Sequence, residues 1–341
     1  MSHPAPDNLV NVDGTFNAGV FSTPFRRLNF DDARRASGVG GRRLIEFQHF
    51  AITSERFHIS VAIFDTKRIG QAQVSIYDRA AKMKYRHERK MFPWEPTLAE
   101  TAWEGGCHFK RGTFEITMHN GLNTGAHEIR FHCPARRGLP EVSGAFRCPE
   151  PLDTPRAVVC IPFAGGGAMY SQKGLLTAEG TLNVAGETHR FTPATAHALT
   201  DFHKGLYPNP LKWNWVTGAG PDGSGGRIAF NLTANQAADP QRYNENWIIH
   251  RNTLHRLPAV TFTIGDSADL RQPWRIQDPT GQVDITFHPE VAHSIDLNVL
   301  VMRSRYRGPY GRTTGTLRLN DGQTIDVGSC FGMAEDFYLR G

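Results

Sequence analysis

The sequence predicts an all-β protein built from two antiparallel β-barrel domains. Many short segments alternate between apolar and polar residues, and several follow one another at spacings near ten residues, which is typical of sandwiches and barrels. The 34 glycines and 21 prolines indicate many turns and few long helices, and the 21 phenylalanines suit packing between sheets. A chain of 341 residues exceeds what one hydrophobic core normally supports, so two domains are expected.

The N-terminal part is expected to be an irregular lead-in over residues 1–40, followed by the first barrel over residues 41–160. Prolines and glycines interrupt every regular period in the lead-in. In the barrel, residues 57–64 alternate cleanly and predict a half-buried strand with Phe57, Ile59, Val61 and Ile63 on one face. No amphipathic helix is predicted before residue 165.

Two connections in this part have distinct signals. Asn120-Gly121 follows the strand predicted at residues 113–118 and indicates a hairpin. Residues 134–155 are rich in Pro, Arg and Gly and predict a long loop or linker.

The second barrel is expected over residues 161–341. Residues 179–191 predict a strand, a tight glycine turn and a second strand, whereas residues 192–203 predict a loop or a single helical turn. Further extended segments are predicted at 226–232, 246–251, 253–257, 260–264, 274–278, 283–289, 297–304, 311–319 and 323–328. Antiparallel barrels can hold a small ligand, so the chain is a candidate for handling one.

Charge and targeting signals restrict the partners and the compartment. The net charge of +5 is mild for this length, and the basic cluster Lys82–Lys90 also contains Glu88, so no nucleic-acid partner is expected. The N-terminus lacks the basic start and apolar run of a signal peptide, and no apolar stretch approaches the roughly 18 residues of a membrane span. We therefore expect a cytoplasmic protein without an integral membrane segment; its oligomeric state has no signal in the sequence.

Neither a metal nor an organic cofactor is expected. The five cysteines are odd in number and lack the two-residue spacing of zinc or redox motifs, so buried free thiols are predicted. The fifteen histidines show no metal-ligating spacing. The glycine-rich stretch 218–226 contains a proline and no helix is predicted after it, so it is not a dinucleotide-binding motif.

The densest mixed chemistry lies between residues 201 and 215. It combines the candidate catalytic residues Asp201, His203 and Lys204 with large apolar side chains, and such surroundings are where ligands usually bind. Candidate substrate-binding residues are Tyr170, Tyr207, Trp213, Trp215, Asn231, Glu245 and Glu335. Trp213 and Trp215 are two residues apart, so on a strand they would share a face, either in a site or in a core.

Several segments in this order resemble the bacterial DUF2804 family. They are Tyr170-Ser171-Gln172-Lys173, Glu179-Gly180-Thr181-Leu182, Asp201-Phe202-His203-Lys204-Gly205, Trp213-Asn214-Trp215 and the C-terminal run Cys330–Asp336. A more distant likeness is to carotenoid 1,2-hydratases and AttH-like proteins, through Tyr170-Ser171, Asp201 and the tryptophan pair. This likeness implies two lipocalin-like (calycin-like) β-barrels in tandem, and a cofactor-independent hydratase, cyclase or related activity.

Two roles for Asp201 remain open. Burial among aromatic side chains would raise its pKa and let it protonate a substrate carbon. A nearby cation such as Lys204 would lower its pKa and make the pair a structural ion pair. The function expected is therefore a lyase, hydratase, isomerase or cyclase acting on an apolar isoprenoid- or polyketide-like molecule; the alternatives are a lipocalin-like carrier of a hydrophobic ligand and a structural scaffold.

Overall fold

The all-β class is confirmed by the structure, a computed structural model that describes residues 3–37, 43–67, 69–92, 94–265, 269–291, 293–299 and 302–340. Within these ranges the helical elements are α1 (Phe30–Ser37) and the 3-10 turn η1 (Leu122–Thr124). Neither is long or apolar enough to span a membrane. The prediction of no helix before residue 165 is wrong for α1, whose eight residues are too few to show an apolar period and whose first turn has Asp31 and Asp32. Residues 38–40 of the expected lead-in lie outside the described ranges.

The chain forms two compact units whose ranges differ from the expected domains. The first comprises Met1–Cys160 with Met169–Leu206, and the second comprises Ile161–Ala168 with Tyr207–Gly341. Residues 169–206, which we expected in the second barrel, are thus part of the first unit. The reason is strand pairing: their long strands complete a sheet of that unit.

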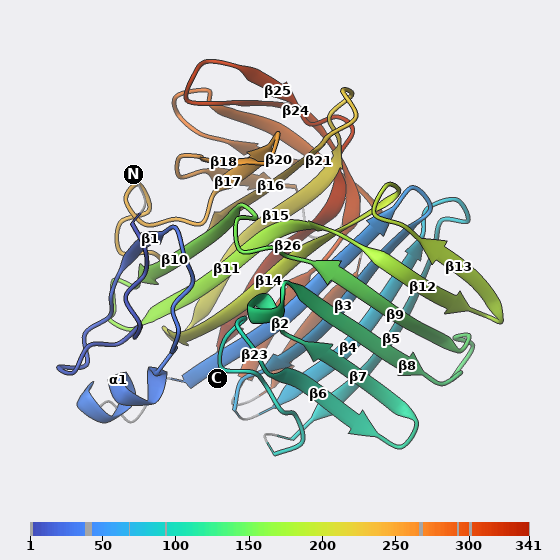
Figure 1. Ribbon diagram of the computed structural model, residues 1–341, viewed down its shortest axis with the longest axis horizontal. Coiled ribbons are helices and arrows are strands. Elements are labelled where there is room, and N and C mark those ends of the chain that lie inside the picture. Colours follow the sequence, from blue (N-terminus) through green and yellow to red (C-terminus); the bar gives the residue numbers. More distant parts are fainter. Residues whose placement is uncertain are drawn as a thin grey trace. The chain divides into compact units, whose positions relative to one another are not determined.

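The first unit contains an eight-stranded sheet, in which β2 to β5 run side by side (Figure 1). In spatial order its strands are β1 (Gly19–Phe21), β10 (Arg156–Pro162), β11 (Ala168–Thr177), β14 (Ala196–Tyr207), β2 (Arg43–Ser54), β3 (Phe57–Asp65), β4 (Gly70–Asp78) and β5 (Met83–Met91). The prediction of a loop or turn over residues 192–203 is wrong, because β14 pairs with β11 over nine residues. The small buried side chains of Ala196 and Ala198 pack within this strand rather than on a helix.

A six-stranded sheet completes the first unit. Its strands, in spatial order, are β13 (Glu187–Phe191), β12 (Glu179–Val184), β9 (Val142–Pro149), β8 (Ala126–Cys133), β7 (Phe114–His119) and β6 (Gly106–Arg111). The predicted 134–155 loop contains β9, whose buried residues alternate with less buried ones until Pro149 ends the strand. Both predicted hairpins are confirmed: η1 joins β7 to β8, and Ala185 and Gly186, with φ of 53° and 88°, form the tight turn between β12 and β13.

The second unit is a twelve-stranded antiparallel sheet. Its strands are β15 (Leu211–Pro221), β16 (Arg227–Ala234), β17 (Trp247–His250), β18 (Thr253–Arg256), β19 (Thr261–Ile264), β20 (Trp274–Gln277), β21 (Val283–Val291), β22 (Ser294–Val299), β23 (Met302–Arg307), β24 (Tyr310–Arg318), β25 (Thr324–Asp326) and β26 (Phe331–Arg340). One apolar core draws on residues from both ends of this sheet, including Phe230, Ile248 and Ile276, so the sheet curls around it.

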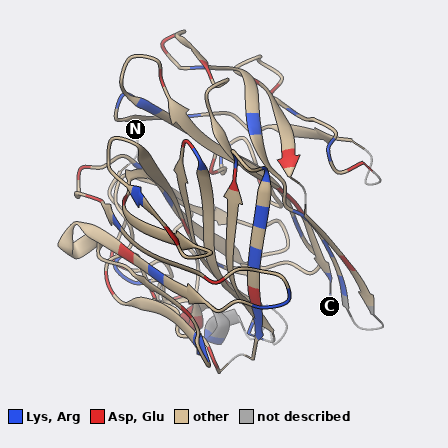
Figure 2. Ribbon diagram, turned by 90° about the vertical axis from the view of Figure 1, so that its right-hand side faces the viewer, with Lys and Arg blue, Asp and Glu red and all other residues tan. Residues whose placement is uncertain are grey.

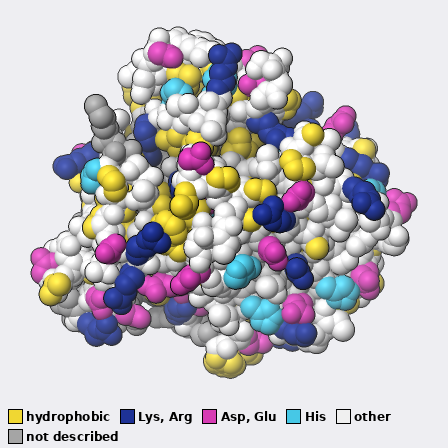
Figure 3. Space-filling view, in the orientation of Figure 1, with side chains coloured by type: hydrophobic (Ala, Val, Ile, Leu, Met, Phe, Trp, Pro, Cys, Tyr) yellow, Lys and Arg dark blue, Asp and Glu magenta, His cyan; other side chains and the backbone are white. Residues whose placement is uncertain are grey.

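Charged residues are spread over many strands and loops of both units (Figure 2). On the face drawn in Figure 3, basic and acidic side chains are intermixed rather than gathered by sign. Several form exposed ion pairs, such as Lys110 with Glu115 and Arg130 with Glu128. Exposed pairs of this kind contribute little to stability.

Candidate functional site

The eight-stranded sheet has an apolar face and a polar face. Phe57, Ile59, Val61 and Ile63 of β3 are buried on the apolar face, as predicted. Because side chains alternate along a strand, His58 and Ser60 lie on the opposite face. The register between β2 and β3 adds further residues to this face, because Ala51 is opposite Ser60 and Thr53 is opposite His58.

Polar residues of four strands therefore share one buried face. We call the polar face the set His49 and Thr53 on β2, His58 and Ser60 on β3, Lys173 on β11 and Asp201 on β14. His58 is 1% exposed and Ser60 is 2% exposed. Buried polar groups are costly unless they are satisfied, so a concentration of them indicates a role beyond packing.

Lys173 and Asp201 form an ion pair on this face. They are directly opposite each other in the register of β11 and β14, and Lys173 Nζ lies 3.4 Å from Asp201 Oδ2. Their side chains are 5% and 14% exposed. The other carboxylate oxygen, Oδ1, is buried and accepts no hydrogen bond within the described part of the chain.

His49 is a neutral imidazole close to this pair. Its Nε2 lies 3.0 Å from Ser60 Oγ. Burial lowers the pKa of His49 to about 4; the Asp201 charge opposes this shift and the Lys173 charge adds to it. At neutral pH the ring is therefore uncharged and can accept a proton.

The cation beside Asp201 is Lys173 and not Lys204, the residue considered in the sequence. Residues 201 and 204 are three apart on β14, so their side chains lie on opposite faces of the strand. Lys204 Nζ lies 2.6 Å from Glu46 Oε1, and Glu46 also pairs with Lys67. The ion pair anticipated between Asp201 and Lys204 is thus absent from the described structure.

His203 shares the face of β14 that carries Asp201. Its ring centroid is 5.7 Å from that of Phe47, and its Nε2 is 3.3 Å from Met169 Sδ. Of the three candidate catalytic residues, Asp201 and His203 are together and Lys204 is on the other face.

The two candidate tyrosines are apart from Asp201. Tyr170 is 1% exposed, and its ring centroid lies 6.3 Å from that of Phe202, on the apolar side of β14. Its hydroxyl donates to Gln172 Oε1 at 2.9 Å, and burial raises the pKa of the phenol. Tyr207 belongs to the second unit, where its ring lies 5.2 Å from that of Phe163.

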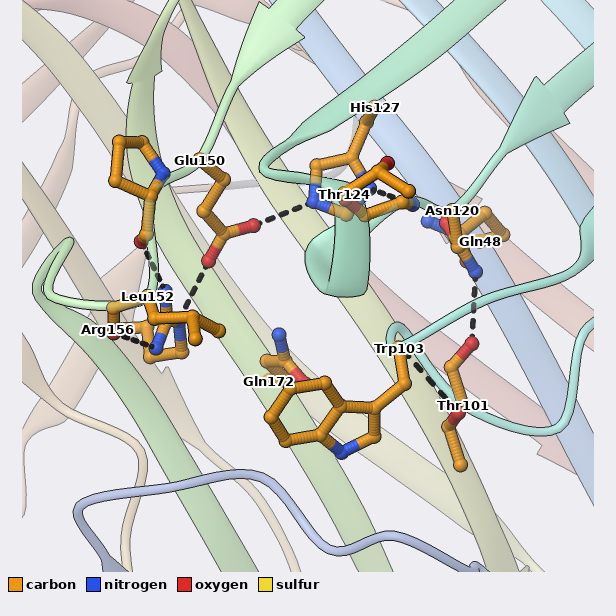
Figure 4. A network of polar contacts seen from close by, with 12 residues as sticks. Gln48, Thr101, Trp103, Asn120, Thr124, His127, Glu150, Leu152, Arg156 and Gln172 are labelled. Carbon is orange, nitrogen blue, oxygen red and sulfur yellow. Dashed lines mark hydrogen bonds and ion pairs between the residues drawn. The ribbon is translucent and has the colours of Figure 1, made fainter.

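A buried polar network that the sequence did not reveal lies within the first unit (Figure 4). Glu150 accepts from Arg156 Nε at 2.6 Å and is 2.5 Å from His127 Nε2. Burial opposes ionisation of Glu150, but the hydrogen bonds and charges of His127 and Arg156 outweigh it and hold the pKa of Glu150 below its usual value. Nearby, Asn120 Nδ2 donates to Gln48 Oε1 at 3.2 Å and to the Thr101 carbonyl at 3.0 Å.

Four of the predicted binding residues come together in the second unit. Glu335 accepts from Trp213 Nε1 and from the Tyr306 hydroxyl, each at 3.0 Å. Trp215 Nε1 donates to Asn231 Oδ1 at 2.6 Å. Trp215 and Glu335 are opposite each other in the register of β15 and β26.

This second cluster faces away from the apolar core of its unit. The neighbours of its residues along the strands, Val216 and Ala334, belong to that core, so the cluster occupies the other face of the sheet. Glu245 joins it through its backbone carbonyl, which accepts from Asn231 Nδ2 at 2.8 Å. Asp201 belongs to the first unit and the two tryptophans to the second, so the run 201–215 is not one local site.

Within the described residues, no group of three or more His, Cys, Asp or Glu side chains is arranged to hold a metal ion. All five cysteines are buried and free, as predicted.

The sequence matches the family described as DUF2804, a domain of unknown function, over residues 2–340. No curated protein matches it. Three solved structures are similar across most of the chain. Kievitone hydratase from Nectria haematococca has 14% identity and a TM-score of 0.54, covering 99% of this chain and 98% of that one.

The other two structures give similar values. A protein assigned as an AttH candidate, from Nitrosomonas europaea, has 13% identity and a TM-score of 0.52, covering 87% of this chain and 92% of that one. CghA, solved with Sch210972, has 11% identity and a TM-score of 0.51, covering 99% of this chain and 97% of that one. At these identities the likeness concerns the fold, and it confirms two lipocalin-like β-barrels in tandem.

Proposed function

We propose that this chain, which belongs to the DUF2804 family, is a cofactor-independent hydratase-type lyase or an isomerase or cyclase, acting on an apolar isoprenoid- or polyketide-like molecule by acid–base catalysis. The observation that carries the proposal is the buried Lys173–Asp201 pair with the neutral His49 beside it. The fold shared with kievitone hydratase supports it. The five buried free thiols fit a reducing compartment such as the cytoplasm.

The chemistry of such a reaction matches what Asp201 offers. Addition of water to an alkene needs one group that gives a proton to carbon and one that takes a proton from water. Lys173 holds Oδ2 of Asp201, which leaves Oδ1 as the oxygen for proton transfer. Neutral His49 supplies the proton acceptor on the same face.

A lipocalin-like carrier of a hydrophobic ligand is the second candidate. It is favoured by the aromatic group of the second unit, in which the ring centroid of Phe337 lies 4.1 Å from that of Trp213 and 6.3 Å from that of Tyr306. Such a surface would bind an apolar molecule without converting it. The Lys173–Asp201 pair would then be structural.

Asp201→Asn, assayed against a panel of terpenoid and polyketide-like alkenes, separates these functions. If the wild-type protein converts a compound, as detected by gain or loss of one water or by isomerisation, we expect the variant to be slower by about 10²-fold or more. Asp284→Asn is the matched control, because its carboxylate pairs with Arg275 at an exposed position. Equal rates for wild type and Asp201→Asn would contradict the catalytic proposal, and binding without conversion would support the carrier.

A further inference from the structure

Ser60 and His49 form a buried hydrogen-bonded pair at the candidate site. Ser60 Oγ is 3.0 Å from His49 Nε2, and the two residues are 2% and 9% exposed. They lie on adjacent strands, because Ser60 is opposite Ala51, two residues from His49 on β2. Neither residue was a candidate in the sequence.

The charges around His49 set its protonation. Asp201 on β14 raises its pKa, Lys173 on β11 lowers it, and burial, the largest effect, lowers it to about 4. His58 on β3 is also electrostatically coupled to it, and its own pKa is well below the usual value because of burial. His49 is thus neutral over the range in which most enzymes work, with one ring nitrogen able to accept a hydrogen bond.

We propose that Ser60 and His49 form the proton relay of this site, with Ser60 contacting the substrate and His49 acting through it. This inference rests on the function proposed above and adds the group that removes the proton from oxygen. In the relay, the O–H bond of the attacking water breaks and its proton goes to Ser60 Oγ. The Ser60 O–H bond breaks in turn, and that proton binds the lone pair of His49 Nε2.

The relay closes the proton balance of a hydration. The water oxygen bonds to one alkene carbon, and Asp201 gives a proton to the other. His49 then carries one extra proton and Asp201 lacks one, so transfer from imidazolium to carboxylate restores both groups. The negative charge of Asp201 stabilises the imidazolium while it exists, as shown by the direction in which it moves the pKa of His49.

Ser60→Ala and His49→Gln test the relay through turnover. We expect each to lower kcat by about 10²-fold or more, with KM little changed. The matched control is Ser75→Ala, because Ser75 is directly opposite Ser60 in the register of β3 and β4, is 0% exposed and has no printed bond to His49. If Ser60→Ala keeps the wild-type kcat, or if Ser75→Ala loses as much as Ser60→Ala, the relay is wrong.

An NMR titration of His49 in the free protein supplies a measurement that does not depend on turnover. We expect Asp201→Asn to lower the pKa of His49 further and Lys173→Met to raise it, because each variant removes one of the two opposing charges. We expect Ser60→Ala, but not Ser75→Ala, to change the ¹⁵N shift of Nε2. A His49 resonance that ignores all three changes would refute the arrangement.

The two proposals fail in different ways. If Asp201→Asn abolishes conversion while Ser60→Ala and His49→Gln retain it, the relay is refuted and the proposed function stands. If the wild-type protein converts no compound, the proposed function fails, and the His49 titration still decides whether Ser60 and Asp201 set the protonation of His49.

Discussion

Lys204 Nζ lies 2.6 Å from Glu46 Oε1, and this pair is on the opposite face of β14 from Asp201. One strand thus serves two separate buried ion pairs. Lys204 neutralises a carboxylate on the apolar face, while Lys173 does so on the polar face. Because the two cations have different partners, their substitution has different consequences.

Glu46 makes stability depend on acidic pH. Burial raises its pKa, but Lys204 and Lys67 outweigh this and leave it below the ordinary 4.5. The unfolded chain therefore binds the proton more tightly, so the stabilisation is present above pH 4.5 and is lost as pH falls through the lower folded-state pKa. We expect Glu46→Gln to flatten this acid limb in urea unfolding measured at several pH values. Glu55→Gln, at an exposed site, should retain it; a retained limb in Glu46→Gln would contradict the assignment.

Lys173→Met should destabilise the protein by about 3 kcal/mol, because it leaves the largely buried carboxylate of Asp201 without its partner. Lys173→Met combined with Asp201→Asn should recover part of this loss, giving a coupling free energy in a double-mutant cycle. Chemical denaturation of the four proteins measures it. The exposed pair Arg275–Asp284 is the control, and its cycle should give less than about 1 kcal/mol. A coupling no larger than that of the control would show that the buried pair is energetically weak.

The Trp213–Glu335 hydrogen bond should be detectable in a second cycle. Trp213→Phe removes the indole donor but keeps an aromatic ring against Phe337, and Glu335→Gln removes the acceptor charge. We expect a coupling free energy of about 1 to 2 kcal/mol, in the range of hydrogen bonds to charged groups. Trp94→Phe, at a side chain that is 78% exposed, should change stability by less than about 0.5 kcal/mol. Additive losses from the two variants would argue against the bond.

The native thiols should resist modification. Burial raises the pKa of Cys107 to about 11 and that of Cys133, Cys148 and Cys330 to about 12, and Cys160 is also raised. Since the thiolate is the reactive form, we expect no reaction with Ellman's reagent at pH 8 in the native protein and reaction of all five thiols in urea. Ala81→Cys, at an exposed turn position, provides a thiol that should react at once. Rapid reaction of a native thiol would mean that its strand opens readily.

Local patterns predicted much of the fold. Residues 57–64 have a period of two, and their apolar face is buried as expected. The turn at Ala185-Gly186 follows from the chemistry of tight turns. The residues of β14 failed this approach because alanine-rich strands resemble helices locally, and only pairing with β11 determines their conformation.

The candidate site was harder to predict because it depends on register. Asp201, Trp215 and Glu335 could be selected as polar or aromatic residues near one another or near a motif. Lys173 was visible in the sequence, but its position opposite Asp201 follows from the pairing of strands about 30 residues apart. The polar alternation of His58 and Ser60 in β3 was the one local signal of a second functional face, and it is equally typical of a solvated strand.

The position of β14 between β11 and β2 has a consequence for biosynthesis. Strands β2 to β5 emerge early from the ribosome, yet they join β1, β10 and β11 only through a strand that ends at Tyr207. The chain also contributes Ile161–Ala168 to the other unit before returning. The N-terminal half thus cannot complete its sheet until about 200 residues have been translated. A nascent chain stopped at residue 160 would expose the unpaired edge of β2, which is the situation that holdase chaperones recognise.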